Sequence, residues 1–247
     1  MIEIKSESEV SLIQEAGRIV KAVLEEVSSA AAPGVTTGEL DRKAEELIKR
    51  FNARPAFKGY KGFPGSICAS VNEQVVHGIP GKTVLRAGDI LSIDVGVEKK
   101  GFYADAAVTV EIGDTVSRGA RELIKATRDA LNAGIKKAVQ GNRLFDISYA
   151  VQDYAERLGY SVVRDFVGHG IGRKMHEEPE IPNFGKPGTG SRLRRGMVLA
   201  IEPMINQGGF EIEILSNGWT AVTKDRKLSA HFEHTVCVTD KEPKILT

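Results

Sequence analysis

Two aspartates, Asp94 and Asp105, lie in two runs rich in β-branched and aromatic residues that flank the polar turn 98–101. This pattern predicts a β-hairpin. A turn at this place pairs residues whose numbers sum to 199, which sets Asp94 opposite Asp105 on one face. Opposed residues have Cβ atoms about 4.5–5.5 Å apart, so two carboxylates there need a shared proton or a cation. The alternative is a pair of solvated aspartates on an open sheet face.

The chain also repeats itself with an offset of 108 residues. Segment 85–94, LRAGDILSID, returns as segment 193–202, LRRGMVLAIE. A period this long indicates a duplicated half of one domain rather than a solenoid. The repeat gives Glu202 the position of Asp94, and alternation along the last predicted strand puts Glu233 beside it. Four unpaired carboxylates would cost several kcal/mol, so we expect metal there rather than surface acids.

One histidine extends this set of carboxylates. His169 lies among glycines in VGHGIG, residues 167–172, where it could be a metal ligand or a turn histidine. Pro179 and Pro182 prevent a long helix soon after it, so a dinucleotide-binding loop is rejected. Neither a His-Glu-x-x-His zinc motif nor a Gly-x-Ser-x-Gly elbow is present. Four carboxylates and one imidazole suit a pair of divalent ions such as Mn, Fe, Co or Zn.

Patterning predicts the elements that carry these residues. Capping boxes at Ser6–Glu9 and Thr36–Glu39 precede apolar residues at helical spacing, which continue to Val27 and Phe51, and two more helices are expected after Ser117 and Gly141. Strands are expected over 66–76, 210–215, 219–223 and 229–238, with a turn at Asn217-Gly218. Because short turns close these strands, we predict an α+β fold whose antiparallel sheet carries the helices on its apolar face.

Composition sets outer limits on function. The 247 residues are 41% hydrophobic and 27% charged, and their formal net charge of +1 favours neither nucleic acid nor membrane as a partner. The N-terminus has no long apolar run, so we expect no signal peptide or transmembrane span and a cytoplasmic location. Cys68 and Cys237 lack CxxC spacing and imply neither a disulfide framework nor a zinc knuckle.

Taken together, these residues closely resemble the methionine aminopeptidases of the short bacterial type I. The resemblance spans nearly the whole chain and is carried by IDVG at 93–96, GHGIG at 168–172, IEP at 201–203, FEHT at 232–235 and VNEQVVHGIP at 71–80. It implies the pita-bread fold, with one catalytic domain over 1–247 built from pseudo-twofold halves of about 1–115 and 116–247. It also implies removal of N-terminal methionine from nascent proteins and peptides when the second residue is small.

The resemblance further implies roles for individual residues. Asp94, Asp105, His169, Glu202 and Glu233 would bind two divalent ions (Co, Mn, Fe or Zn), and a water bridging the ions would attack the peptide carbonyl while Glu202 relays its proton. His176 would donate to the oxyanion, and His77 would contact the scissile amide nitrogen. The methionine pocket would be formed by Tyr60, Phe63, Cys68, Met175 and Trp219, together with the two histidines. A monomer is expected, and transient contact with the ribosome is left open.

Three further points follow from the sequence. Family members often have a hydroxyl residue after the second aspartate, whereas Ala106 follows Asp105 here, so a hydrogen bond that tunes metal preference could be missing. A prolidase or Xaa-Pro aminopeptidase shares the five ligands but usually carries an extra N-terminal domain. A non-catalytic pita-bread module would tend to lose ligands, and all five are present here.

Overall fold

The computed structural model describes residues 2–247, and its first two helices begin where the capping boxes predict. Helix α1 spans Glu7–Ala30 and α2 spans Thr37–Arg50. The side chains of Ser6 and Thr36 each accept a hydrogen bond from the third helical residue, whose glutamate reaches back to the cap. Both boxes are therefore confirmed. Phe51 lies just beyond α2 and is 44% exposed, so the apolar face of this helix ends before it.

The second pair of helices is also confirmed. Helix α3 spans Arg118–Ile135 with Ser117 as its N-cap, and α4 spans Leu144–Arg157. Gly141, in a left-handed conformation, lies between them. The two helices contact each other, and each buries one apolar face.

The strands within residues 2–247 form three antiparallel sheets. The longest follows the order β1-β4-β5-β14-β9-β7-β8, with β2 paired to β4 and β15 paired to β14. The smaller sheets have the orders β13-β10-β6 and β11-β12-β3. The strands span β1 Arg54–Pro55, β2 Ile67–Val71, β3 Gln74–Val76, β4 Ile90–Lys99, β5 Phe102–Glu111, β6 Ser161–Val162, β7 Val167–Gly170, β8 Glu177–Pro182, β9 Val198–Ile201, β10 Met204–Asn206, β11 Ile212–Ile214, β12 Ala221–Thr223, β13 Ser229–His231, β14 Glu233–Cys237 and β15 Lys244–Ile245.

The predicted hairpin β4–β5 exists, but its predicted register is wrong by two residues. Asp94 pairs with Ala107 and Asp105 pairs with Gly96, so the two aspartates are not directly opposite. The turn contains only Lys100 and Gly101, which both have positive φ as a tight two-residue turn requires. A shift by two keeps every side chain on its predicted face, and both aspartates still share one side of the hairpin.

Two other predicted strands are interrupted. The stretch 66–76 breaks at Asn72, which has a φ of 56°, and forms β2 and β3 in different sheets. The stretch 229–238 breaks at Phe232, so that β13 and β14 also belong to different sheets. The strands predicted over 210–215 and 219–223 are confirmed in shortened form as β11 and β12. Alternation alone could not show where a strand leaves one sheet for another.

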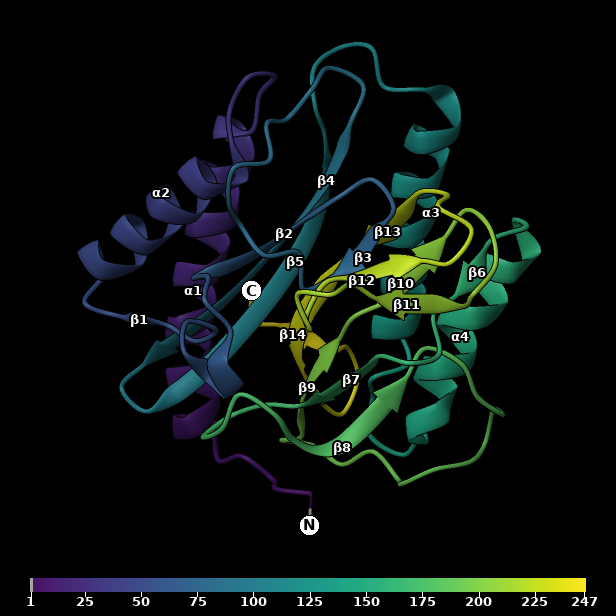
Figure 1. The fold of residues 1–247 in the computed structure, drawn as a ribbon. Coiled ribbons are helices and arrows are strands. Elements are labelled where there is room, and N and C mark those ends of the chain that lie inside the picture. Colours follow the sequence, from purple (N-terminus) through teal and green to yellow (C-terminus); the bar gives the residue numbers. More distant parts are fainter. Residues whose placement is uncertain (1) are drawn as a thin grey trace.

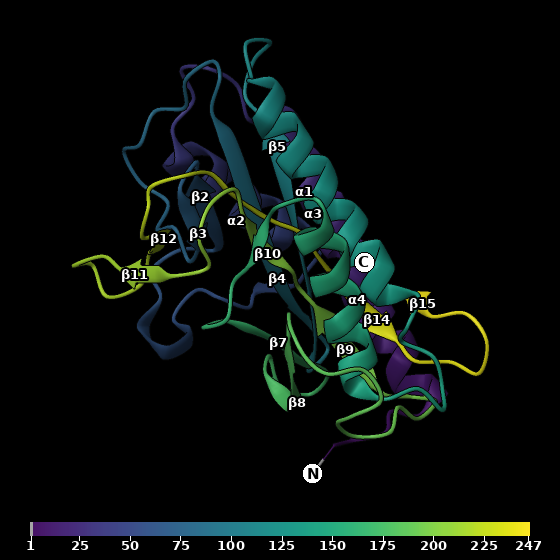
Figure 2. The same ribbon diagram turned by 90° about the vertical axis from the view of Figure 1, so that its right-hand side faces the viewer.

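The helices lie on one side of the long sheet, and the small sheet that contains β11 and β12 lies on the other (Figures 1 and 2). Helix α1 packs against β4 and β5, and α3 packs against β13 and β10. The helix-covered face holds the largest hydrophobic cluster, which includes Ile13, Val20 and Ile93. Among the described residues, no helix combines the length and apolar character needed to cross a bilayer. The opposite face is left free to form a site.

Candidate metal centre and substrate pocket

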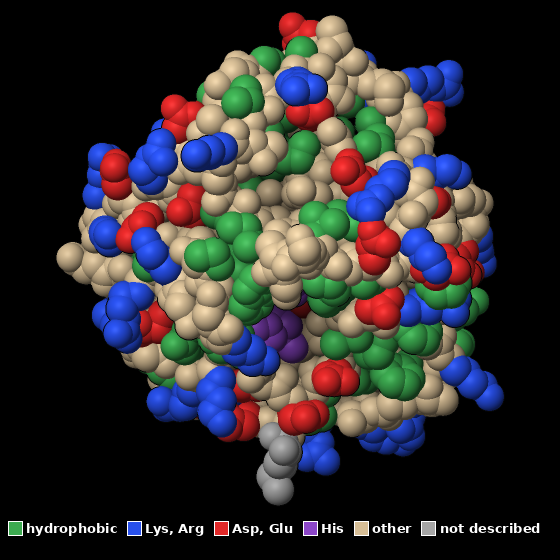
Figure 3. All heavy atoms as spheres, in the orientation of Figure 1, with side chains coloured by type: hydrophobic (Ala, Val, Ile, Leu, Met, Phe, Trp, Pro, Cys, Tyr) green, Lys and Arg blue, Asp and Glu red, His purple; other side chains and the backbone are tan. Residues whose placement is uncertain are grey.

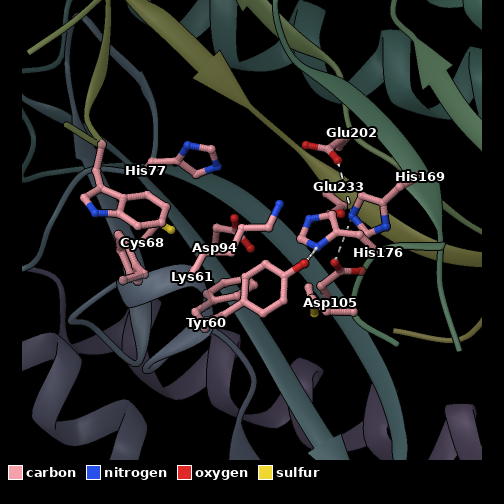
Figure 4. A pocket seen from close by; sticks show the side chains of 14 residues that line it. Tyr60, Lys61, Cys68, His77, Asp94, Asp105, His169, His176, Glu202 and Glu233 are labelled. Carbon is pink, nitrogen blue, oxygen red and sulfur yellow. Dashed lines mark hydrogen bonds and ion pairs between the residues drawn. The ribbon is translucent and has the colours of Figure 1, made fainter. Parts of the chain in front are cut away.

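The five predicted metal ligands come from five strands that are neighbours in the long sheet. Asp94 lies on β4, Asp105 on β5, Glu233 on β14 and His169 on β7, and Glu202 directly follows β9. All five line one cavity (Figure 4). Candidate ligand atoms of Asp105, His169 and Glu233 lie within 4.8 Å of one another. The Nε2 atom of His169 is 3.4 Å from Asp105 Oδ2 and 3.6 Å from Glu202 Oε1.

Burial makes this cluster unfavourable as a set of free charges. Asp105 and Glu233 are each 2% exposed, and His169 is 6% exposed. Burial, reinforced by neighbouring carboxylates, raises the pKa of Asp94 and Glu233 well above the usual range, and burial raises the pKa of Glu202 to about 8. Burial alone would lower the pKa of His169, but hydrogen bonding and charge from Asp105 outweigh it and raise the pKa to about 9. The cluster therefore holds protons when it holds no cation.

The residues present fit divalent metal. The Oδ1 atom of Asp94 is buried without a hydrogen-bond partner, although carboxylate oxygens normally find donors. Four carboxylates and one imidazole form an oxygen-rich donor set that suits divalent first-row metals. A cation would satisfy the orphaned oxygen and remove the repulsion that keeps these groups protonated.

The hydroxyl that the sequence lacks after Asp105 is supplied from another strand. Ala106 is 1% exposed and lies on the core face of β5. On β14, the hydroxyl of Thr235 lies 3.0 Å from Asp105 Oδ1 and 2.8 Å from its carbonyl oxygen, and accepts from its N–H at 3.1 Å. Asp105 therefore has a hydroxyl neighbour in Thr235, although Ala106 offers none. Thr235 was missed, although its position two residues after Glu233 places it on the same face.

The two predicted catalytic histidines flank the cavity. His176 stacks on Tyr60, with ring centroids 5.2 Å apart, and its Nδ1 lies 3.0 Å from the Tyr60 hydroxyl (Figure 4). Burial and the neighbouring His169 lower the pKa of His176 to about 4. His77 packs edge-on against Phe166 at 5.2 Å, and burial lowers its pKa. Both rings are thus held by aromatic neighbours.

The residues of the predicted methionine pocket form much of the remaining cavity wall. Tyr60, Phe63, Cys68, Met175 and Trp219 all line it, with Phe63 edge-on to Trp219 at 5.2 Å. Figure 3 shows histidine side chains in a hollow with hydrophobic side chains around it. Two further lining residues were missed, Phe57 and Lys61. Gly96 gave a signal for Phe57, because a Cβ there would lie 2.6 Å from Phe57 Cε1 and a strand glycine often marks a close approach.

Comparison with known proteins places this site in a family. The model of metallopeptidase family M24 matches residues 11–240. Methionine aminopeptidase from Clostridium acetobutylicum is 54% identical over 248 residues, covering 100% of this chain and 99% of that protein. Methionine aminopeptidase 1 from Bacillus subtilis is 49% identical, covering 100% of this chain and 99% of that protein.

Solved structures agree with the fold. The crystal structure of a methionine aminopeptidase from Thermotoga maritima matches with a TM-score of 0.98 and 46% identity, covering 100% of this chain and 99% of that one. A prolidase from Pyrococcus furiosus shares the fold at 22% identity and a TM-score of 0.79, and this chain covers only 65% of it. The pita-bread α+β fold is thereby confirmed. The chain belongs to metallopeptidase family M24, among the methionine aminopeptidases.

Proposed function

We propose that this protein removes the N-terminal methionine from nascent proteins and peptides whose second residue is small. The observation that carries the proposal is one cavity shared by the acidic cluster and the apolar wall. An unbranched methionine side chain suits a pocket lined by Phe63, Met175 and Trp219. Full-length likeness to proteins named methionine aminopeptidase supports the same function.

The ligands fit two divalent ions, and we assign them to the two ions by resemblance to the methionine aminopeptidases. Asp105, Glu233, His169 and Glu202 would hold one ion, and Asp94 with Asp105 and Glu233 would hold the other. Bound divalent ions lower the pKa of water to near 7 and polarise a carbonyl oxygen, so they would supply the nucleophile and activate the peptide bond. Co, Mn, Fe and Zn all accept this donor set.

The chain's own groups then handle protons and orientation. The Oε1 atom of Glu202 lies 3.6 Å from His169 Nε2. The Glu202 carboxylate can accept a proton at the reacting centre and pass it to the leaving amine. His176 faces the cavity as a neutral imidazole, whose free N–H can donate to the developing oxyanion. His77 stands on the opposite wall, where it can contact the scissile amide nitrogen.

The two histidines also account for the preference for a small second residue. His176 is stacked on Tyr60, and His77 is wedged against Phe166 and Trp219, at 5.2 Å and 6.3 Å. The ring of His77, packed against two aromatic neighbours, cannot move aside cheaply, so a large second side chain would collide with it. Newly made chains are the substrates we expect, which places the activity in the cytoplasm. We infer a monomer with one catalytic domain over 1–247, built from two related halves, because the acidic cluster and the apolar wall already form one cavity.

A peptide series tests the proposal. The Mn²⁺-loaded protein should cleave Met-Gly-Ser and Met-Ala-Ser fastest, Met-Val-Ser more slowly, and Met-Leu-Ser and Met-Lys-Ser least. Ala-Pro peptides should not be cleaved. Equal rates on Met-Ala-Ser and Met-Lys-Ser would overturn the size rule, and preferred cleavage of Ala-Pro would favour the Xaa-Pro aminopeptidase activity instead.

A further inference from the structure

One buried histidine beside the acidic cluster is not used by the mechanism above. His231 ends β13 and is 2% exposed. Its Nε2 atom has no hydrogen-bond partner, and Oε2 of Glu202 lies 3.7 Å away. A buried nitrogen without a partner costs free energy and therefore requires an explanation.

The backbone of His231 is held firmly, so the direction in which its side chain leaves the backbone is a property of the fold. The hydroxyl of Thr109 accepts from the His231 N–H at 2.9 Å and donates to its carbonyl oxygen at 2.8 Å. The hydroxyl of Ser92 supports that of Thr109 from 2.8 Å. Pairing of His231 with Met204 in the small sheet fixes the register.

Glu202 consequently lies between two imidazoles. His169 approaches its Oε1 at 3.6 Å, and His231 approaches its Oε2 at 3.7 Å. The backbone carbonyl of Glu202 is held separately by the side-chain amide of Asn183 at 3.1 Å. A carboxylate that must present one particular oxygen to a metal needs a donor on its other oxygen.

We propose that His231 is a positioning residue, whose Nε2–H donates to Oε2 of Glu202 and leaves Oε1 on the His169 side free to bind metal. A shift of less than 1 Å brings the present 3.7 Å separation into hydrogen-bond range. The proposal rests on the assignment of Glu202 as a metal ligand but not on the identity of the substrate.

The alternative role, a sixth metal ligand, is less well supported. The Nε2 atom of His231 lies 3.7 Å from Glu202 Oε2, whereas the Nε2 atom of His169, a proposed ligand, lies near both Asp105 and Glu202. A ligating nitrogen would also have to carry its lone pair toward the cluster instead of a proton toward Glu202.

Two substitutions separate these roles. His231→Gln keeps an N–H donor at similar reach, whereas His231→Leu removes the donor and keeps an apolar side chain of similar size. His234→Leu is the matched control, because His234 lies only three residues away, on β14, but its Nδ1 is 2.9 Å from the Thr247 hydroxyl. Should His231→Leu fail to fold, His231→Met replaces it.

Calorimetric titration of the metal-free proteins with Mn²⁺ is the main measurement, and it needs no substrate. His231→Leu should bind one Mn²⁺ equivalent about 10–100-fold more weakly, whereas His231→Gln should stay within about threefold of the parent protein. The control should bind Mn²⁺ as the parent does. Metal-free His231→Leu should melt no lower than the parent, because the unpartnered buried nitrogen is gone.

Several results would overturn the proposal. Unchanged Mn²⁺ affinity in His231→Leu would mean that Glu202 needs no donor there. Equal losses in the Gln and Leu variants, with a changed absorption spectrum of the Co²⁺-loaded protein in both, would make His231 a ligand. A lower melting temperature of metal-free His231→Leu with unchanged metal affinity would assign it a packing role. These outcomes are measured as metal affinity and melting temperature, so they test the role of His231 even if the protein fails to cleave methionine peptides.

Discussion

Loading the metal-free protein with divalent metal should release protons, because the ligands are protonated when no cation is present. Burial raises the pKa of Glu202 to about 8, and Asp105 raises that of His169 to about 9 despite its burial. Burial and neighbouring carboxylates raise the pKa of Asp94 and Glu233 as well. Metal requires ionised carboxylates and neutral imidazole, so these protons must leave.

The pKa values set the size of the effect. At pH 7, groups with pKa values of about 8 and 9 are mostly protonated, so Glu202 and His169 contribute close to one proton each. Asp94 and Glu233 add to this number, and the total belongs to the coupled cluster rather than to any one residue. We expect a release of at least about two protons when both ions bind. Metal and protons compete, so the overall two-ion binding constant should fall about a hundredfold for each unit of pH below 7.

Calorimetry in several buffers measures this release directly. Mn²⁺ is titrated into the metal-free protein at pH 7 in buffers with different enthalpies of protonation, and the slope of observed heat against buffer enthalpy gives the number of protons. Glu202→Gln provides a comparison: its amide cannot titrate, so the variant should release fewer protons for each Mn²⁺ that it still binds. A slope near zero would refute the reasoning, since it would mean that the buried ligands are already ionised without metal.

Four substitutions test the division of roles within the site. Asp94→Asn should keep one tight metal equivalent and weaken the second, because Asp94 is the one ligand assigned to the second ion and not shared with the first. Two undisturbed sites in a Mn²⁺ titration would contradict the assignment. His176→Ala should lower kcat about 10²–10³-fold with metal content intact, whereas His169→Ala should lose metal. Equal metal loss in both variants would contradict the assignment of His169 as metal ligand and His176 as oxyanion donor. Tyr60→Phe keeps the stacked ring but frees His176 Nδ1, so kcat for Met-Ala-Ser should fall while KM stays nearly constant; a rise in KM alone would reduce Tyr60 to a pocket residue.

The sequence predicted the faces of the hairpin correctly but not its register. Face assignment depends only on whether a shift is odd or even, and the true register differs from the predicted one by two residues. Register depends on the turn, and a two-residue turn at Lys100-Gly101 has positive φ at both positions. A lysine at such a position carries no clear sequence signal, because glycine or asparagine is usual there.

Helix boundaries were predictable because their signals are local. The capping boxes at Ser6 and Thr36 lie within four residues of the helices they start. The interruptions at Asn72 and Phe232 were missed because each depends on which distant strand offers a partner. The same is true of Thr235, whose hydroxyl meets Asp105 across 130 residues of chain.

The sheet order explains why local patterns alone could not bring the site together from sequence, and why the internal repeat and the family resemblance were needed. Each ligand lies on or directly beside a different strand, and β5 is joined to β14 rather than to the next strand in the chain. No local window therefore contains more than two ligands, and the hairpin alone left solvated aspartates as an equal alternative. The repeat made Glu202 equivalent to Asp94. It therefore predicted that these two residues lie on the same face of the sheet, although they are far apart in sequence. His231 has no counterpart in this reasoning, because its relation to Glu202 arises only where β13 passes from one sheet to the next.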